Sequence, residues 1–569
     1  MNLYTLLWSP SFDEYDLNVI DLKIMGDRIG AMDRFSELPD YIIHHIMSYL
    51  STEEAAQTCV LSKRWNHLHA SFPILDFDQI YFVGKALATK KPDFLSIREK
   101  RRFCKHINRF IQFVDASLLR FCERKVSMQK FRLSMTLLDV EGDTSLLDNW
   151  IELAVANEVK EFDFNVQTDD MLYSLPETIF SAKFLTTLKL SGCNLEQSSN
   201  SIRFHSLKKL ALDNVGMDEQ MVQKFISECP LLEDFFIFPA WNFKCVCVSH
   251  APKLKIVTID GSFYTVESIE IVAPSLQQCT LIHLGNTCVI NMSGCPHLNS
   301  LELKSVNVDV VLDLISKIPL LEKLIIHNCH YLGRFAFSSN QLKDLQFLYC
   351  NQLDAIDVDA PALLSFSYQC SHPCISSINV PCPCPWKLRF LIDHEGGGFY
   401  LPTLTWFECI KEEFIRVAHQ VKELSMSINV KDSFTLDEFR KRSPSLPRDV
   451  ENLIIDVQKV PPSKYAAYLD CLLWICFPRI LCIEAKQRKT SIKFIETVYE
   501  KLINRDTKCC NSNIIKCWRH YLKDFKVESF VPYKDPKPLR VDNLMIELPR
   551  LPEGTIRFHL DWCFFFTYS

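Results

Sequence analysis

The chain has 569 residues, enough for several ordinary domains or for one long repeat array. Hydrophobic residues make up 48% of it and the formal net charge is −6, which argues against a disordered chain and against a broad cationic surface for nucleic acid. The first residues, MNLYTLLWSP, lack the basic start of a secretory signal, and no apolar stretch is long enough to span a bilayer. We therefore expect a folded protein of the cytoplasm and/or nucleus, in which the 24 cysteines are reduced thiols.

Three short helical patterns follow one another between residues 33 and 75. The first has apolar residues at every fourth position: Leu38, Ile42, Ile46 and Leu50. Ser51 with Glu54 three residues later forms a capping box that predicts a second helix over 52–59, and Ser62 can cap a third helix. A module this small cannot bury so many large apolar side chains within itself, so we expect part of this surface to meet a partner.

The segment closes with the phrase VLSKRW at 60–65, after the pair Leu38-Pro39. In these positions the chain resembles the F-box of plant proteins, the motif that docks a protein onto the Skp adaptor of a cullin-based ubiquitin ligase. The resemblance implies an adaptor-contacting and supporting apolar surface made of Leu38, Pro39, Ile42, Ile46, Leu50, Val60, Leu61 and Trp65. The alternative is a helical hairpin that packs only on its own domain.

A six-residue phrase, apolar-x-x-apolar-x-apolar, recurs through the middle of the chain. Its copies start at Leu185, Leu207, Leu232, Leu254, Leu276, Leu298, Leu321, Leu342 and Leu363. The alternation at the end of each phrase predicts one half-buried strand, and helical patterns at 218–228 and 309–318 predict returns between strands. The spacing and the leucines resemble a leucine-rich repeat, which implies an α/β fold: a three-helix F-box followed by an irregular solenoid with a parallel sheet.

The phrase and the composition suggest a division of the whole chain. We expect a flexible leader at 1–31, the F-box at 33–75, a helical linker at 76–125, leucine-rich repeats at 126–370, an irregular loop or insertion at 371–420, longer α/β repeats at 421–530 and a C-terminal cap at 531–569. The linker carries a helical pattern at 95–122, and the longer repeats carry helical patterns at 464–476 and 491–504. A solenoid needs such a cap because its last repeat would otherwise expose its core.

Residues between the buried positions of stacked strands point into the concave face of a solenoid. On that face we select as candidates for target binding Phe236, Phe238, Lys189, Lys209, Glu302, Lys304 and Lys323. The two phenylalanines would be aromatic anchors. A local slip of the strand register would instead turn both rings inward.

No catalytic site can be located from the sequence, because the phosphate-loop, nucleophile-elbow and zinc-protease motifs are all absent. One proline-rich segment holds the best metal candidates: Cys370, His372, Cys374, Cys382 and Cys384. Their spacing is not that of paired zinc knuckles, so buried thiols in a loop are the favoured interpretation. Cys509-Cys510 is interpreted as a core or surface pair rather than a redox site. We assign no catalytic residue, no metal and no cofactor.

The resemblance implies a non-catalytic, substrate-recognition subunit of a Skp–cullin–F-box ubiquitin ligase. Such a subunit binds the Skp adaptor and, through it, the cullin, while its solenoid recruits a target protein for ubiquitination. Neither nucleic acid nor a membrane is an expected partner. Two alternatives stay open: an F-box/repeat interaction scaffold without a degradative role, and a small-molecule-sensing receptor, which would need a basic pocket on the concave face.

Overall fold

The protein is described here by a computed structural model. It describes residues 38–84, 96–137, 140–167, 172–195, 202, 204–239, 243–261, 266–285, 287–329, 333–350, 353–370, 377–380, 384–393, 403–429, 435–457, 460–484, 488–505, 509–510, 515–530, 536–539, 544 and 555–563. The chain forms two compact units, residues 1–207 and 208–569, each with its own core. The leader expected at 1–31 lies outside the described residues.

Three helices open the described part of the first unit. They are α3 (Asp40–Met47), α4 (Thr52–Gln57) and α5 (Lys63–Ala70), with the single turn η1 (Thr58–Val60) before α5. Ser51 accepts a hydrogen bond from the backbone N–H of Glu54, whose carboxylate accepts one from the backbone N–H of Ser51, and Ser62 accepts one from the N–H of Trp65. Both caps predicted from the sequence are therefore present, and they hold α4 and α5 where the sequence places them.

The rest of the first unit is a small parallel sheet with helices beside it. Its strands pair in the order β1 (Ile74–Asp78), β2 (Lys130–Thr136), β3 (Glu161–Gln167) and β5 (Thr187–Ser191). The helices that follow α5 are α6 (Ile80–Val83), α8 (Ile97–Cys122) and α9 (Val140–Ala156). β1 falls across the expected boundary between F-box and linker, so the sheet begins earlier in the chain than the repeats expected at 126–370.

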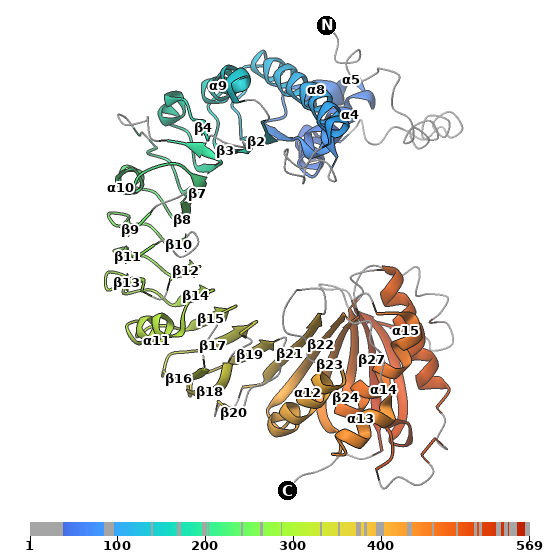
Figure 1. Cartoon of the computed structure of the whole chain (residues 1–569). Coiled ribbons are helices and arrows are strands. Elements are labelled where there is room, and N and C mark those ends of the chain that lie inside the picture. The colour runs from blue at the N-terminus through green and yellow to red at the C-terminus, as the bar shows by residue number, and fades with distance from the viewer. Residues whose placement is uncertain are drawn as a thin grey trace, which may run out of the picture. The chain divides into compact units, whose positions relative to one another are not determined.

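The second unit continues the same construction over many more strands (Figure 1). Its parallel sheet pairs, in order, β7 (Lys209–Val215), β8 (Asp234–Pro239), β10 (Ile256–Asp260), β12 (Gln278–Ile282), β14 (Ser300–Lys304), β15 (Lys323–His327), β17 (Asp344–Leu348), β19 (Ser365–Cys370), β21 (Trp386–Asp393), β22 (Val421–Asn429), β23 (Arg448–Val457) and β24 (Cys476–Glu484). Each strand of this sheet from β7 to β19 begins two residues after the first residue of a repeat phrase, and every one of these phrase-initial leucines is buried. The register read from the sequence is therefore confirmed, because only this register places the leucines in the core.

The returns between these strands are either helices or short outer strands, with three outer strands after each of the first two helices. The two helices expected at 218–228 and 309–318 are present as α10 (Glu219–Glu228) and α11 (Val308–Ser316). Other returns form two small parallel sheets, β9–β11–β13 (Cys245–Val248, Ser268–Ile271, Val289–Asn291) and β16–β18–β20 (Gly333–Ser338, Leu353–Asp359, Ser377–Asn379). Short returns of this kind suit repeats too brief for a helix.

The later part of the second unit has longer strands and a layer of helices (Figure 1). These helices are α12 (Thr403–Val417), α13 (Leu436–Arg442), α14 (Tyr465–Ile475) and α15 (Arg488–Ile503). The prediction of an irregular loop or insertion at 371–420 is wrong for the described residues of this stretch, because β21 and α12 both lie there. The prolines, cysteines and glycines around these two elements made the stretch look irregular in the sequence. The strand nevertheless contains the fully buried Trp386 and Phe390, and the helix contains several buried aromatic residues.

The C-terminal segment closes the sheet with a change of direction. β27 (Thr555–Trp562) lies antiparallel between β24 and β25 (Leu522–Phe530), and β26 (Lys537–Leu539) pairs with the other edge of β25. The cap expected at 531–569 thus contains a strand inserted into the sheet, which satisfies the backbone groups that β24 would otherwise present at an edge. Just before β25 the chain forms the single turn η5 (Trp518–His520). Among the described residues, no helix is both long and apolar enough to cross a membrane.

Candidate binding surfaces

The three N-terminal helices enclose a small apolar core. Its fully buried members are Ile43, Met47, Trp65, Leu68 and Phe72. Leu38 and Ile46 pack against this core from outside and stay half-buried. An ion pair between Arg64 and Asp40 joins α5 to α3 at the surface. The helices therefore form a self-consistent module rather than a loose hairpin.

The eight residues expected to serve the adaptor occupy three different environments. Val60 and Leu61 are 67% and 59% exposed, and Pro39 is exposed as well. Leu38, Ile42, Ile46 and Leu50 are half-buried. Trp65 is only 2% exposed, so it supports the module from inside and has little surface left for a partner.

Two tyrosines add to the exposed apolar surface of the module. Tyr41 on α3 is 71% exposed and Tyr49, just after α3, is 77% exposed. Large apolar side chains left in water by a folded module mark a surface for another macromolecule. The sequence pattern predicted no role for either tyrosine, although both interrupt the polar side of the first helical pattern.

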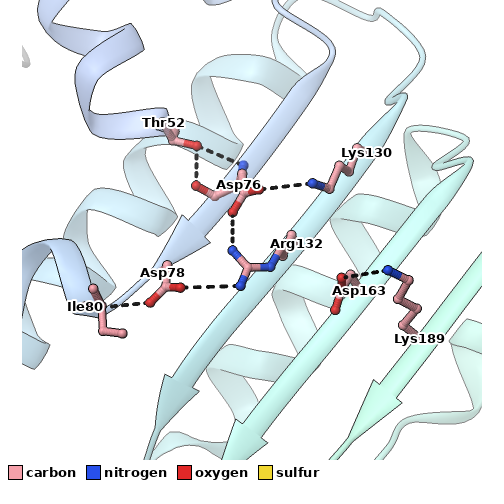
Figure 2. A network of polar contacts seen from close by, with 8 residues as sticks. All are labelled: Thr52, Asp76, Asp78, Ile80, Lys130, Arg132, Asp163 and Lys189. Carbon is pink, nitrogen blue, oxygen red and sulfur yellow. Dashed lines mark hydrogen bonds and ion pairs between the residues drawn. The ribbon is translucent and has the colours of Figure 1, made fainter. Parts of the chain in front are cut away.

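A set of polar contacts, which we call the anchor network, attaches the helical module to the sheet (Figure 2). Thr52 on α4 uses its hydroxyl twice: it accepts a hydrogen bond of 2.8 Å from the Asp76 backbone N–H and donates one to the Asp76 carbonyl. The Asp76 carboxylate accepts hydrogen bonds from Lys130 at 3.0 Å and from Arg132 at 2.8 Å, both on β2. Arg132 also reaches Asp78 at 3.4 Å. One helix and two strands are thereby joined through Thr52, Asp76 and Arg132.

A second contact fixes α5 to the long helix α8. The Arg120 guanidinium donates hydrogen bonds to the Asn66 side chain and to the Asn66 carbonyl, the latter at 3.3 Å. Arg120 also affects the pKa of His69, which lies one turn after Asn66 on α5 and is largely buried. Burial, and after it the positive charge of Arg120, lowers the pKa of His69 from 6.5 to about 4.

The side of each parallel sheet that faces away from the core, here called the open face, carries the non-buried residues of the strands. Phe236 and Phe238 lie on this face of β8. Phe235, which precedes them, and Ile237, which lies between them, are fully buried. The alternative of a register slip is therefore wrong. Phe236 stands between the small side chains Ala211 and Thr258 of the neighbouring strands.

The charged candidates on the open faces are paired across strands rather than clustered. In the first unit Lys189 lies 3.7 Å from Asp163 (Figure 2). In the second unit Lys209 lies 3.3 Å from Asp234, and Lys323 lies 3.7 Å from Asp344. Alternating partners of opposite sign stabilise neighbouring strands modestly and remove much of the cationic field that an anionic small molecule would need.

Glu302 and Lys304 form a pair within one strand. Their charged groups lie 3.0 Å apart on β14, and the Thr280 hydroxyl of the next strand donates a 3.4 Å hydrogen bond to Glu302. The open faces therefore combine ion-paired rows with the two aromatic rings of β8. That composition suits a protein surface better than a charged ligand.

The two cysteine-containing stretches considered in the sequence, the proline-rich metal candidate and the Cys509-Cys510 pair, have different outcomes. Of the proline-rich set, Cys370 and Cys384 are buried, and His372, Cys374 and Cys382 lie outside the described residues. Among the described residues, one group of side chains could hold a metal ion: Cys509, Cys510, Cys517 and His520. The sequence favoured an ordinary core or surface pair for Cys509-Cys510, and nothing in its pattern connected this pair with Cys517 and His520.

Comparison with known proteins agrees with these features. The F-box domain family matches residues 35–73, and the family described as "FBD-associated F-box protein At5g56370, LRR repeats" matches residues 147–302. Among relatives from Arabidopsis thaliana, the "F-box/LRR-repeat protein At3g58900" is 32% identical over 251 residues, which is 43% of this chain and 71% of that protein. The "F-box/FBD/LRR-repeat protein At5g56420" is 29% identical over 50% of this chain and 61% of that protein.

The matched stretch covers less than two thirds of most of these relatives; for the "Putative F-box/LRR-repeat protein At5g41840" it is 37%, at 32% identity over 36% of this chain. A three-helix module that carries an F-box and leads into a parallel repeat sheet defines an F-box protein with leucine-rich repeats. The chain belongs to the F-box/LRR-repeat protein family of plants. Proteins of this family are typically non-catalytic adaptors.

Proposed function

We propose that this protein is the substrate-recognition subunit of a Skp–cullin–F-box ubiquitin ligase. The observation that carries the proposal is the pair Val60 and Leu61, exposed to water on an F-box module that is itself fixed to the first strand of a repeat sheet. The module binds the Skp adaptor, the adaptor brings the cullin, and the open face of the repeats holds a target protein. The complex works in the cytoplasm and/or nucleus.

The mechanism is geometric and needs no covalent step on this chain. A ligase raises the local concentration of target lysines near a ubiquitin-charged enzyme, and this gain depends on how firmly the two binding ends are connected. The anchor network and the Arg120–Asn66 contact provide that firmness at the F-box end, because they fix α4 and α5 to the sheet and to α8 at separate points.

Binding of the adaptor is tested by placing charge on the exposed pair. The double change Val60→Asp with Leu61→Asp leaves the buried core intact but puts two carboxylates into an apolar interface. We expect binding of a purified Skp adaptor, measured by isothermal titration calorimetry, to weaken by about 100-fold or more, since ~3 kcal/mol corresponds to that factor.

The matched control is Leu364→Asp, because Leu364 is 70% exposed but lies in the second unit, between β17 and β19. The control is expected to bind the adaptor as the unchanged protein does. Adaptor binding that survives both the double change and Leu38→Ala with Pro39→Ala would refute the proposal. Trp65 is unsuitable for this test because its loss would unfold the module.

Recruitment of a target is tested on the open face. The double change Phe236→Ser with Phe238→Ser removes the two aromatic rings while leaving Phe235 and Ile237 in the core. Proximity labelling in plant cells, with and without proteasome inhibition, should show a protein that accumulates beside the unchanged chain and is lost with the variant. Phe184→Ser is the control, since Phe184 is half exposed outside the strands.

The same experiment separates the alternatives. A partner that is captured equally with and without the inhibitor, and is not ubiquitinated, would support an interaction scaffold instead. A partner captured only after addition of a small molecule would support a receptor. Either result contradicts the proposed constitutive recruitment for degradation.

A further inference from the structure

Four potential metal ligands meet in the segment that connects α15 to β25. Cys509 and Cys510 lie near the start of this segment, and Cys517 and His520 lie at η5, just before β25 begins. Their donor atoms all lie within 4.8 Å of one another. The four side chains converge from two stretches of chain on one point.

The spacing of the donor atoms matches the edges of a coordination tetrahedron. Cys509 Sγ lies 3.8 Å from Cys510 Sγ, 3.3 Å from Cys517 Sγ and 3.6 Å from His520 Nε2. Zinc bonds of about 2.3 Å to sulfur and about 2.0–2.1 Å to nitrogen place tetrahedral sulfurs about 3.8 Å apart, and a sulfur and a nitrogen about 3.6 Å apart. Of the three edges that meet at Cys509, the one to Cys517 is shorter than this by a few tenths of an ångström.

A disulfide does not account for the same arrangement. Bonded sulfurs lie about 2.05 Å apart, well below the separations seen here, and adjacent cysteines are awkward to bridge. A disulfide would also leave one thiol and the imidazole without a role. Three thiolates and one imidazole instead make a complete four-ligand set for a closed, structural zinc site.

The surrounding side chains suit a negatively charged metal centre. Arg440 on α13 donates to Cys510 Sγ at 3.6 Å and to the carbonyl of Ile515. Arg519 donates to Cys517 Sγ at 3.7 Å while its guanidinium is held on Asp470 of α14 at 2.6 and 2.7 Å. Three thiolates around Zn²⁺ carry a net charge of −1, which these two arginines stabilise.

We infer that Cys509, Cys510, Cys517 and His520 form a structural zinc site that fastens the α15–β25 connection to α13 and α14. The connection leads directly into the antiparallel strands that close the sheet, so the metal stabilises the C-terminal cap. This site is independent of the proposed ligase function, and its failure would leave the adaptor experiment unaffected.

The test uses the full chain, produced without a polyhistidine tag and kept reduced. Elemental analysis is expected to find about one zinc per chain, falling to nearly none in Cys509→Ser with Cys510→Ser. Cys563→Ser is the control, because Cys563 is exposed and outside the cluster. Neither of the two changed cysteines lies in the core, so both variants should keep their circular dichroism spectrum.

A second measurement identifies the ligands even if the variant folds poorly. Zinc is removed from the unchanged chain with a chelator and Co²⁺ is added, which should produce sulfur-to-cobalt charge transfer and the intense visible bands of tetrahedral cobalt. Removal of zinc should also increase hydrogen exchange in β25. A reduced chain without zinc or a cobalt spectrum, zinc that persists in the double variant, or a native Cys509–Cys517 disulfide would each overturn the assignment.

Discussion

The Thr52 hydroxyl makes the two backbone hydrogen bonds with Asp76 that a neighbouring strand would otherwise make. It pairs with both the N–H and the carbonyl of that one residue, on the edge of β1 that no described strand covers. An exposed strand edge invites pairing with other chains, and a helix that covers it prevents this. The contact thus protects the sheet and positions the F-box with a single side chain.

Replacing this hydroxyl by a methyl group should loosen the F-box from the sheet. Thr52→Val keeps the shape but leaves the buried Asp76 N–H without its partner, which costs about 1–3 kcal/mol. We expect faster hydrogen exchange in β1 and α4, measured by mass spectrometry. Thr52→Ser retains the hydroxyl and should exchange nearly as the unchanged protein does. Equal exchange in the valine and serine variants would contradict this role.

His69 should make the F-box module sensitive to acid. Its pKa is about 4 in the folded chain, against about 6.5 unfolded, so below pH 6.5 the unfolded chain binds the additional proton. Stability is therefore lost as the pH falls from 6.5 to 4, by at most ~3 kcal/mol. Peptides of α5 should lose exchange protection at pH 5 in the unchanged protein and much less in His69→Gln.

The control for this effect is His67→Gln, which changes an exposed histidine on the same helix. It should lose protection at pH 5 as the unchanged protein does. If His69→Gln and His67→Gln respond to acid alike, the acid sensitivity has another origin.

In the second unit, Lys411 should make the stability depend on pH above 7, whereas His69 acts in the acid range. It is fully buried on α12 beneath Trp474, and it donates to the carbonyls of Ser443 and Ser445 at 3.1 and 2.6 Å. Burial, and after it the charge of Arg440, lowers its pKa from 10.5 to about 7. Between these values the unfolded chain binds more protons, so stability rises with pH above 7, and the full cost of burial applies below 7.

Lys411→Met removes this dependence. The unchanged protein should gain stability relative to the variant by up to ~1.4 kcal/mol per pH unit between pH 7 and 9, in urea denaturation of the second unit. Lys422→Met, an exposed change in the same repeat, serves for comparison. A constant difference between the unchanged protein and Lys411→Met across this range would show that Lys411 keeps its proton.

Gly192 should be the least replaceable glycine among those described in the first unit. It follows β5 with φ of +71°, and a Cβ there would meet the Val166 carbonyl oxygen at 2.2 Å. Gly192→Ala combines a left-handed backbone with a clash against a strand, so we expect a loss of about 3 kcal/mol or more. Gly84→Ala has a similar φ of +81° but open space around it, and should lose only about 1 kcal/mol.

Both glycine variants are compared by urea denaturation of the full chain, with the transition of the first unit as the readout. The ratio between them isolates the clash from the backbone strain. Similar losses in the two variants would mean that the Val166 carbonyl moves aside at little cost.

The turns that follow the repeat strands show how much of a repeat can be predicted from its local sequence pattern. At the turns that end β7 and β15, Asn214 and Asn328 adopt the left-handed conformation, with φ of 51° and 50°. The position that faces the core at this turn belongs to the next residue, and Cys329 and Cys350 occupy it, donating weakly to carbonyls of the preceding repeat. A cysteine three residues after the end of the phrase could have predicted this core-facing position, since leucine-rich repeats accept asparagine or cysteine there.

The sequence by itself determined the helix caps, the three F-box helices and the strand register, because each depends on residues within one or two turns of chain. Ser51, Ser62 and the phrase-initial leucines have the same partners in nearly any context. Tertiary structure alone decided the Thr52–Asp76 contact, the insertion of β27 beside β24 and the meeting of Cys509 with His520. These features join residues that are distant in the chain or separated by irregular segments, where no periodic pattern of side chains records which atoms will meet.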